Sequence, residues 1–476
     1  EQVNVKINGV SYEVPANSTI LEAASVAGID IPTLCYLKDI NQIGACRMCM
    51  VEVKGAKSLV AACVYPVNDG MEVFTNSPKV QESRRMTLEL LLSVHDKKCL
   101  SCERSGNCEF QKLCNDMGIE EENRYEGEVP AGKKDYSTLY LERNNAKCVL
   151  CRRCVAACQN QHVSVIGANN RGFDTEIGCA FEQPLSNVAC VACGQCIVSC
   201  PTGALTEKDN TQEVIDAIND PDKVVIVQTA PAVRAALGEE FGLPIGTNVE
   251  GKMVAALRRL GFDKVFDTDF GADMTIMEEA SEFIDRVKNG GKLPMITSCS
   301  PGWVKFCEHY YPDLLDNLST CKSPQNMAGA LIKTWYAQKE GIDPNNIVSV
   351  SVMPCTAKKF EINRDDENAA GLPDVDISIT TRELARMIKK AQLNFVRLPE
   401  EKFDDAMGVS TGAAVIFGAT GGVMEAALRT AADLLTGESQ DNIEYTEIRG
   451  TEGFKEAVYK VAGMDVKVAV VSGLSN

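Results

Sequence analysis

Cysteines grouped at short, regular spacings constrain this chain more than any other feature. The sequence holds 21 cysteines in 476 residues, and ten of them stand at Cys-x-x-Cys spacing. The first residues, EQVNVKINGV, lack the charged and apolar segments of a secretion leader. Disulfides are uncommon in large chains without such a leader, whereas cysteines at this spacing are typical metal ligands. The pattern therefore predicts a protein organised around metal or iron–sulfur sites.

Two repeats of one cysteine pattern lie near the middle of the chain. CVLCRRCVAAC starts at residue 148 and CVACGQCIVSCP starts at residue 190, and both read Cys-x2-Cys-x2-Cys-x3-Cys. In such pairs three cysteines of one repeat bind a 4Fe-4S cluster together with the last cysteine of the other repeat. Zinc sites do not use this crossed arrangement. We expect two clusters with these ligands: Cys148, Cys151, Cys154 and Cys200 for one, and Cys190, Cys193, Cys196 and Cys158 for the other.

Two further groups of candidate ligands precede the repeats. The first group follows a ferredoxin-like start of two strands and a helix, expected within residues 3–27. The second group follows a helical stretch and includes a histidine. Zinc and iron both accept four thiolates, or three thiolates and one imidazole, so spacing alone leaves the metal open. The groups are Cys35, Cys46, Cys49 and Cys63, and then His95, Cys99, Cys102 and Cys108.

Beyond about residue 210, apolar runs alternate with amphipathic segments, as in an α/β domain. We expect strands in the runs 223–231, 293–303, 347–359 and 413–420. Ligands sit at the carboxyl ends of such strands, which is where Cys299 and Cys355 occur. The segment GATGGV lacks the spacing of nucleotide-binding glycine motifs, so we interpret it as a turn beside a cofactor.

The segments TSCSPGW at 297–303 and MPCTAKKFE at 353–361 resemble two of the three signature motifs of iron-only (diiron) hydrogenases. DFGADMTIMEEA, STCKSPQ and FGATGGVMEAALR are also similar to that family, and the N-terminal half is similar to the large subunit of respiratory complex I. The resemblance implies an α+β multidomain fold. Its parts would be a β-grasp 2Fe-2S ferredoxin domain at 1–80, a small His-ligated 4Fe-4S domain at 81–126, a bacterial-type two-cluster 4Fe-4S ferredoxin domain at 127–209, and a two-lobed α/β hydrogenase domain at 210–476.

The resemblance also implies cofactors and roles. It assigns one 2Fe-2S cluster to the first cysteine group, a 4Fe-4S cluster to the His95 group, and so three 4Fe-4S clusters in all. An H-cluster, a 4Fe-4S cubane joined to a diiron unit, is expected in the complete protein. Cys355 would bind the cubane and Lys358 would pair with a cyanide. The diiron unit would be lined by Ala230, Pro231, Gln325, Met353, Phe417 and Gly418.

A proton relay is implied through Cys299, Glu279, Ser319 and Glu282, with Arg286 near its outer end. The helical spacing places Glu279, Glu282 and Arg286 on one face. Without the resemblance, that spacing is more typical of an ordinary solvated acidic face.

Two departures from the family pattern affect the H-cluster. Position 300 is serine where the family motif has a cubane-binding cysteine, so Ser300 as an alkoxide ligand and Cys299 as a ligand instead of a relay group are both open. The third signature motif does not occur, and no cysteine follows Cys355. We therefore expect that the chain is C-terminally incomplete.

The reading that follows is an iron-only hydrogenase subunit that interconverts H2 with protons and electrons, within an electron-bifurcating NADH- and ferredoxin-linked complex. The alternative is a non-catalytic electron-relay or hydrogenase-like sensor subunit. Expected partners are a flavoprotein NADH-binding subunit, a small ferredoxin-like subunit and ferredoxin. The 48 Lys and Arg against 66 Asp and Glu, a net charge of -18, disfavour nucleic acid. No apolar run is long enough for a membrane span, and we expect a cytoplasmic protein.

Overall fold

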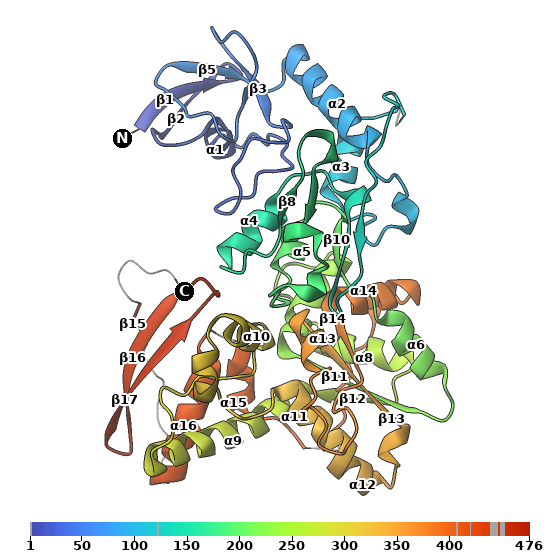
Figure 1. Ribbon diagram of the computed structural model, residues 1–476, viewed down its shortest axis with the longest axis vertical. Helices are drawn as coiled ribbons and strands as arrows, with labels where there is room; N and C mark the ends of the chain where they lie inside the picture. Colours follow the sequence, from blue (N-terminus) through green and yellow to red (C-terminus); the bar gives the residue numbers. More distant parts are fainter. Residues whose placement is uncertain (1, 121–122, 406–407, 419, 438–445, 448–452) are drawn as a thin grey trace. The chain divides into compact units, whose positions relative to one another are not determined.

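The computed structural model describes residues 2–120, 123–405, 408–418, 420–437, 446–447 and 453–476 (Figure 1). The chain divides into two compact units. The first comprises 1–190 and 194–206, and the second comprises 191–193 and 207–476. Among the helices of the described segments, none has the length and apolar character of a transmembrane span.

The first unit begins with a five-stranded mixed sheet. Its strands are β1 (Gln2–Ile7), β2 (Val10–Pro15), β3 (Met50–Val53), β4 (Val60–Ala61) and β5 (Met71–Phe74), in the order β2-β1-β5-β3-β4. Helix α1 (Ile20–Val26) begins with a capping box between Thr19 and Glu22 and buries Ile20 against the sheet residues Val5 and Ile7. The expected ββα start is confirmed.

Two helices flank the histidine group. Helix α2 (Pro78–Ser93) is capped by Ser77, whose hydroxyl accepts a hydrogen bond from the Val80 amide, and has proline in its first turn. The turn η1 (Cys99–Ser101) and helix α3 (Glu109–Asp116) follow. Helix α2 ends two residues before His95, so the imidazole follows directly from the helix terminus.

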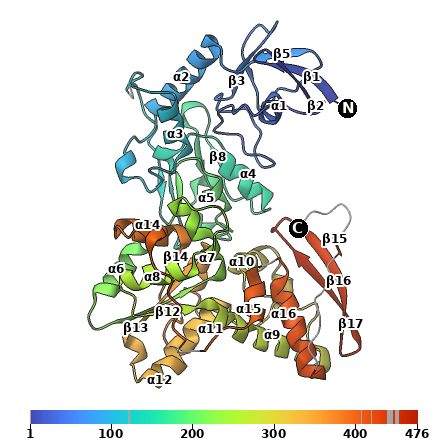
Figure 2. The same ribbon diagram turned by 180° about the vertical axis from the view of Figure 1, so that it is seen from behind.

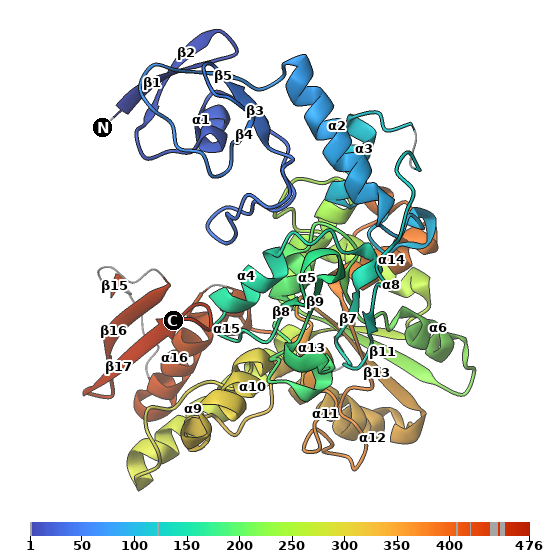
Figure 3. The ribbon, with the colours of Figure 1, turned by 45° about the horizontal axis from the view of Figure 1, so that its top comes forward.

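The segment with the two cysteine repeats is built from short elements. Strands β6 (Lys134–Asp135), β7 (Leu141–Asn144) and β10 (Leu205–Glu207) form one sheet, and β8 (Gly167–Asn169) pairs with β9 (Glu176–Gly178) in a hairpin between the repeats (Figure 3). Helices α4 (Arg153–Asn160) and α5 (Gln195–Ser199) each begin within a repeat and pack together. The two repeats therefore form matching loop–helix units.

The second unit is built on a parallel four-stranded sheet in the order β12-β11-β13-β14. Its strands are β11 (Val224–Thr229), β12 (Lys264–Asp267), β13 (Ile347–Met353) and β14 (Ile377–Thr380). Helices α6 (Thr211–Asn219), α8 (Glu250–Leu260) and α14 (Thr381–Lys390) contribute to the core on one face. Ile332 and Tyr336, from the segment after α11 (Pro324–Leu331), cover Ile226 and Phe266 on the other. The α/β arrangement is confirmed.

The remainder of the second unit gathers around the long helix α9 (Thr268–Asn289). Helix α16 (Gly422–Thr436) packs against α9, and the hairpin of β16 (Phe454–Val461) and β17 (Met464–Val471) packs against α16 (Figure 2). A short strand, β15 (Thr446–Glu447), pairs with β16. Helix α11 approaches α9 closely because Gly271 has no side chain, and an added Cβ would lie 2.3 Å from the Pro324 carbonyl.

Two expected strands are wrong. The run 293–303 makes only an isolated bridge between Ile296 and Leu318, and from Pro301 it is helix α10 (Pro301–Tyr310). The run 413–420 is instead helical in its described part, as α15 (Gly412–Val415) and η11 (Ile416–Gly418). Thr411 caps α15 through its hydroxyl, which accepts from the Ala413 amide. An apolar composition is compatible with a strand and with a helix. The described residues of the two runs have no neighbouring strand with which to form a ladder, and the Thr411 cap favours the helix in the second run.

Candidate metal centres

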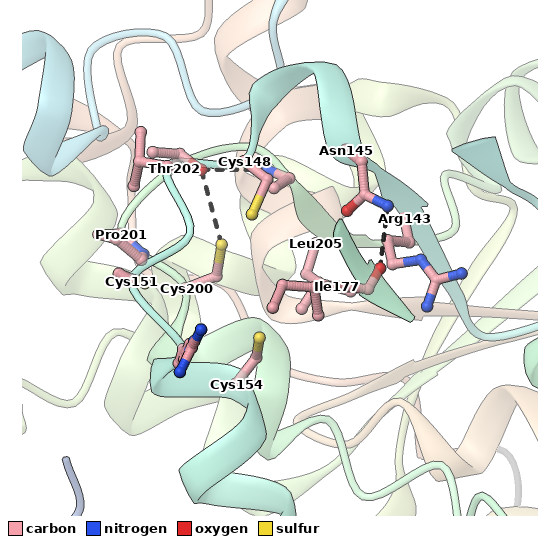
Figure 4. Close-up of a pocket in the computed structure, with 13 residues that line it drawn as sticks. Arg143, Asn145, Cys148, Cys151, Cys154, Ile177, Cys200, Pro201, Thr202 and Leu205 are labelled. Carbon is pink, nitrogen blue, oxygen red and sulfur yellow. Dashed lines mark hydrogen bonds between the residues drawn. The ribbon is translucent and has the colours of Figure 1, made fainter. Parts of the chain in front are cut away.

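Four cysteines from both repeats line one pocket of the first unit. Figure 4 shows the side chains of Cys148, Cys151, Cys154 and Cys200 among the residues that line this pocket. The Thr202 hydroxyl lies 3.7 Å from Cys200 Sγ and donates to the Lys147 carbonyl at 2.8 Å, which ties the two repeats together. The structure thus brings together the crossed set that the spacing predicts.

The thiols of this pocket favour the protonated form when no metal binds them. Burial raises the pKa of Cys148 to about 11 and that of Cys151 to about 12, and it raises the pKa of Cys154 well above its usual value. Four thiolates in such a pocket would be strongly unfavourable unless positive charge compensated them. A 4Fe-4S cluster supplies that charge and matches a set of four thiolates.

The backbone of both repeats adds a second feature suited to a cluster. Leu150 and Arg152 have φ of 52° and 61°, and the equivalent Ala192 and Gly194 have 58° and 72°. Left-handed residues in such loops form nests of amide N–H groups that bind anionic groups, including iron–sulfur clusters. The Leu150 amide already donates to Cys148 Sγ at 3.3 Å. The loops therefore fit the implied group at backbone level as well.

Three of the four cysteines of the second crossed set lie in the first unit. Cys158, Cys190 and Cys196 are buried in the first unit, whereas Cys193 belongs to the second. The hydroxyl of the buried Tyr140 makes a hydrogen bond with the Cys190 side chain. Sequence reasoning missed Tyr140 because no spacing rule connects it with the repeats.

The first cysteine group also converges. The Cys35 amide donates to Cys46 Sγ at 3.4 Å, and the Cys46 amide donates to Cys35 Sγ at 3.5 Å. Side-chain hydrogen bonds join Cys35 to Cys63 and Cys49 to Cys63. Contacts with Cys46 and Cys63 lower the pKa of Cys35. Four thiols linked by these pairwise contacts fit the four-thiolate set of a 2Fe-2S cluster.

The histidine group has an unpaired ligand atom. Nδ1 of His95 is buried and has no hydrogen-bond partner among the described residues, while burial lowers the pKa of His95 to about 4. A neutral imidazole with a free ring nitrogen is suited to bind a metal. Cys102 Sγ lies against Gly203, where an added Cβ would stand 2.7 Å from the sulfur, and Cys108 Sγ lies 3.6 Å from the Pro201 carbonyl.

The expected relay residues form a hydrogen-bonded chain in the second unit. The Thr297 hydroxyl donates to Glu279 Oε1 at 3.0 Å and lies 3.7 Å from Cys299 Sγ. Glu279 makes a side-chain hydrogen bond with Ser319, and the Ser319 hydroxyl donates to Glu282 Oε2 at 3.1 Å. Arg286 ends the chain, because its Nη2 donates to Glu282 Oε1 at 2.6 Å. Thr297 is a link that the sequence analysis did not identify.

The two carboxyls of this chain differ in proton affinity. Burial raises the pKa of Glu279, which is 2% exposed. Burial also acts to raise the pKa of Glu282, but hydrogen bonds and charge from Arg286 and the Thr320 amide outweigh it and leave the pKa lowered. Burial raises the pKa of the Cys299 thiol as well. The chain therefore starts at a protonated thiol and passes a carboxyl suited to hold a proton.

A buried glutamate anchors the lysine of the second motif. Lys358 Nζ donates to the Cys299 carbonyl and to Glu361 Oε2, both at 2.9 Å. The same Glu361 oxygen accepts from Gln325 Nε2 at 2.6 Å and from the Ser323 hydroxyl at 2.7 Å. Glu361 thus holds Lys358 and Gln325 together, and Lys358 connects them to Cys299. The i,i+3 spacing of Lys358 and Glu361 was the feature of the sequence that could have indicated this contact.

The other expected residues sit at several elements of the second unit. Ala230 and Pro231 follow β11 at the start of α7 (Pro231–Ala236). Met353 ends β13, and Cys355 lies two residues later, before α13 (Ala357–Glu361). These positions share the carboxyl edge of the parallel sheet. Ser300 precedes α10, is exposed and makes no capping hydrogen bond. Phe417 and Gly418 lie on η11.

Comparison with known proteins gives matches along most of the chain. Residues 223–476 match the family described as iron only hydrogenase large subunit, C-terminal domain. Residues 1–78 match a 2Fe-2S iron-sulfur cluster binding domain, and 84–123 match the NADH-ubiquinone oxidoreductase-G iron-sulfur binding region.

Individual relatives cover nearly the whole chain. The NADP-reducing hydrogenase subunit HndD of Solidesulfovibrio fructosivorans is 52% identical over 100% of this chain and 83% of its own length. Iron hydrogenase 1 of Clostridium pasteurianum is 46% identical over 99% of this chain and 82% of its own length. The solved structure of the FeFe-hydrogenase HydA(deltaEFG) is 46% identical, with a TM-score of 0.48, over 52% of this chain and 63% of that one.

Proposed function

The chain belongs to the iron-only hydrogenase family and is an oxidoreductase that acts on H2, and we propose how its own residues serve the reaction. It carries 2Fe-2S and 4Fe-4S binding domains and an H-cluster domain. The proposed reaction is the reversible conversion of H2 into two protons and two electrons. The observation that carries this proposal is the unbroken chain of side chains from Cys299 to Arg286.

Protons would move between hydrogen-bonded neighbours of this chain. The Cys299 thiol gives its proton to Thr297 Oγ1 while the Thr297 hydroxyl gives its own to Glu279, so Thr297 donates once and accepts once. Glu279 can hold the proton because burial raises its pKa. Glu279 then gives this proton to Ser319 Oγ while the Ser319 hydroxyl gives its own to Glu282, which Arg286 keeps oriented.

The residues around Lys358 would hold the catalytic group. The H-cluster, when bound, supplies the metal at which H2 is split or formed. Lys358 presents a positive charge fixed by Glu361, and Gln325 is oriented by the same carboxylate. Cys355 is proposed as a cubane ligand. Of the two open readings at positions 299 and 300, the hydrogen-bonded position of Cys299 favours the relay role.

We propose one 2Fe-2S cluster and three 4Fe-4S clusters as the electron route. The order of the cysteine groups along the chain suggests that electrons pass through the clusters in a simple series. The contacts between the ligand loops of the first unit instead favour a branched route in which two clusters feed a third. One apolar cluster contains Cys35 of the first group together with Cys151 of the first repeat, and Cys46 and Cys108 pack against it. Electrons from the 2Fe-2S site and from the His95 site would therefore meet at the pocket of Cys148, Cys151, Cys154 and Cys200.

The proposed setting is a multisubunit complex. One relative is named as a subunit of an NADP-reducing hydrogenase, which supports a hetero-oligomer. We propose a flavoprotein NADH-binding subunit, a small ferredoxin-like subunit and ferredoxin as partners in electron bifurcation, in the cytoplasm. The alternative, a hydrogenase-like sensor or electron relay, is favoured by one observation: serine at position 300 in place of the family's cysteine.

Infrared spectroscopy and turnover test these proposals together. The full-length protein, produced with maturation proteins, should show carbonyl and cyanide bands and evolve H2 from a reduced donor. Lys358→Ala should lose activity while the exposed-site control Lys390→Ala keeps it. Bands without turnover would indicate the sensor, and absent bands with intact iron–sulfur spectra would indicate the electron relay.

A further inference from the structure

A single buried side chain joins two of the candidate cluster sites. The amide nitrogen Nδ2 of Asn41 donates to the Cys35 carbonyl at 2.7 Å and to the Cys151 carbonyl at 3.1 Å. Cys35 belongs to the first cysteine group, and Cys151 belongs to the first repeat, 110 residues from Asn41. Asn41 is only 4% exposed. Both hydrogens of one amide group are therefore used to bridge backbones that carry ligands of different clusters.

The loop around Asn41 is itself rigidly held. Leu37 and Asn41 exchange two backbone hydrogen bonds, at 2.9 Å and 2.8 Å, which close a tight turn between them. Asp39 within the turn has a φ of 60°. This turn begins two residues after Cys35, and the side chain of Asn41 reaches back to the Cys35 carbonyl. The turn therefore holds the backbone of Asn41 in place independently of the contact between its side chain and the first repeat.

The surroundings of the bridge are apolar. Cys35 and Cys151 share a buried cluster with Leu34, Met48 and Val149. A buried carbonyl that loses its donor there cannot readily turn to water, and an unsatisfied buried polar group is costly. Both carbonyls depend on the same nitrogen. Removal of Asn41 would therefore loosen the contact between the two ligand loops more than removal of an exposed hydrogen bond would.

We propose that Asn41 is a positioning residue that fixes the spacing and orientation of the 2Fe-2S site relative to the first 4Fe-4S site. The link runs from the Cys35 carbonyl through one amide group to the Cys151 carbonyl, so it also provides a short hydrogen-bonded path between ligand residues. This inference rests on the proposed clusters. It assigns Asn41 no contact with iron or substrate, and its role is to set how two electron carriers face each other.

The next residue offers a matched control. Gln42 is exposed, and its side-chain amide donates to the Cys63 carbonyl. It therefore touches the first cysteine group as Asn41 does, but through a ligand residue of the same site only. Replacing each residue by leucine removes a donor of comparable kind. Only Asn41→Leu removes a donor that reaches the first repeat.

The experiment uses the full chain with its clusters reconstituted. Wild type must first show 2Fe-2S and 4Fe-4S signals in electron paramagnetic resonance; if it does not, the proposed function fails before Asn41 is tested. Spin coupling of the reduced 2Fe-2S cluster to its neighbour is then measured, with hydrogen–deuterium exchange of residues 148–154. Asn41→Leu should keep both signals, but the spin coupling between the two clusters should weaken or disappear. The protection of the amides of residues 148–154 against hydrogen exchange should fall about 10- to 100-fold.

Gln42→Leu should leave the coupling and this protection as in wild type. Unchanged coupling in Asn41→Leu would overturn the proposal, and so would an equal loss in Gln42→Leu. If Asn41→Leu fails to retain iron, Asn41→Ala, which removes the donor without adding volume, is judged by the same criterion. If Asn41→Ala also fails to retain iron while Gln42→Leu retains it, the residue stabilises a site rather than positioning two, and the proposal is overturned.

Discussion

Replacing Thr297 by valine removes one hydroxyl from the relay and little else. Valine has nearly the same shape, and Thr297 is exposed, so the free energy of unfolding should change by less than about 1 kcal/mol. Thr297 Oγ1 is the atom that contacts both Glu279 Oε1, at 3.0 Å, and Cys299 Sγ, at 3.7 Å. Loss of a positioned proton-transfer group costs roughly 10²- to 10⁴-fold in rate, or about 3 to 5 kcal/mol in the barrier. Thr297→Val should therefore lose most H2 evolution while remaining folded.

The assay is H2 evolution from a chemically reduced donor, measured in H2O and D2O beside iron content and thermal unfolding. A larger solvent isotope effect in Thr297→Val would place the deficit in proton transfer. Thr297→Ser is the matched control, because it keeps a hydroxyl at the same position and should retain most activity. The reasoning fails if Thr297→Val stays within about twofold of wild type, or if Thr297→Ser loses as much.

Three further predictions concern other features. Gly203→Ala should displace Cys102, because the new Cβ would lie 2.7 Å from its sulfur, at an overpacking cost of about 1–3 kcal/mol, and should diminish the cluster signal of the His95 site; Gly167→Ala, with nothing within 4 Å, is the control. Asp269 has a pKa raised to about 7 by burial, so the folded protein keeps a proton that the unfolded chain releases near 4, and stability is lost as pH rises through that window. Asp269→Asn should thus raise the melting temperature at pH 8 and leave it unchanged at pH 4, as calorimetry can check. Chelation of iron should lower the melting temperature of the wild-type protein, and an unchanged value would contradict the proposed buried clusters.

Ligand spacing carried the prediction in the first half of the chain because cluster geometry dictates it locally. The crossing of Cys200 to the pocket of Cys148 could be expected for that reason. The side chains that connect the candidate sites with their surroundings could not be predicted in this way. Thr297, Tyr140 and Asn41 act through contacts with residues distant in sequence or through a folded loop, and no periodicity or motif marks such contacts. The two wrong strands, at 293–303 and 413–420, have a related cause: an apolar run does not reveal whether a neighbouring strand exists to pair with it.

The left-handed loop residues connect the fold to the clusters energetically. Leu150, Arg152 and Ala192 hold positive φ without being glycine, at a cost of order 1–3 kcal/mol each. Only Gly194, at the position equivalent to Arg152, avoids that cost. Since the Leu150 amide is aimed at Cys148 Sγ, the same conformation that is strained also directs donors toward sulfur. Hydrogen bonds to a charged acceptor are stronger than those to a neutral one, so the strain is best offset when the sulfurs are thiolates on iron. The repeats are therefore built to be most stable with their clusters in place.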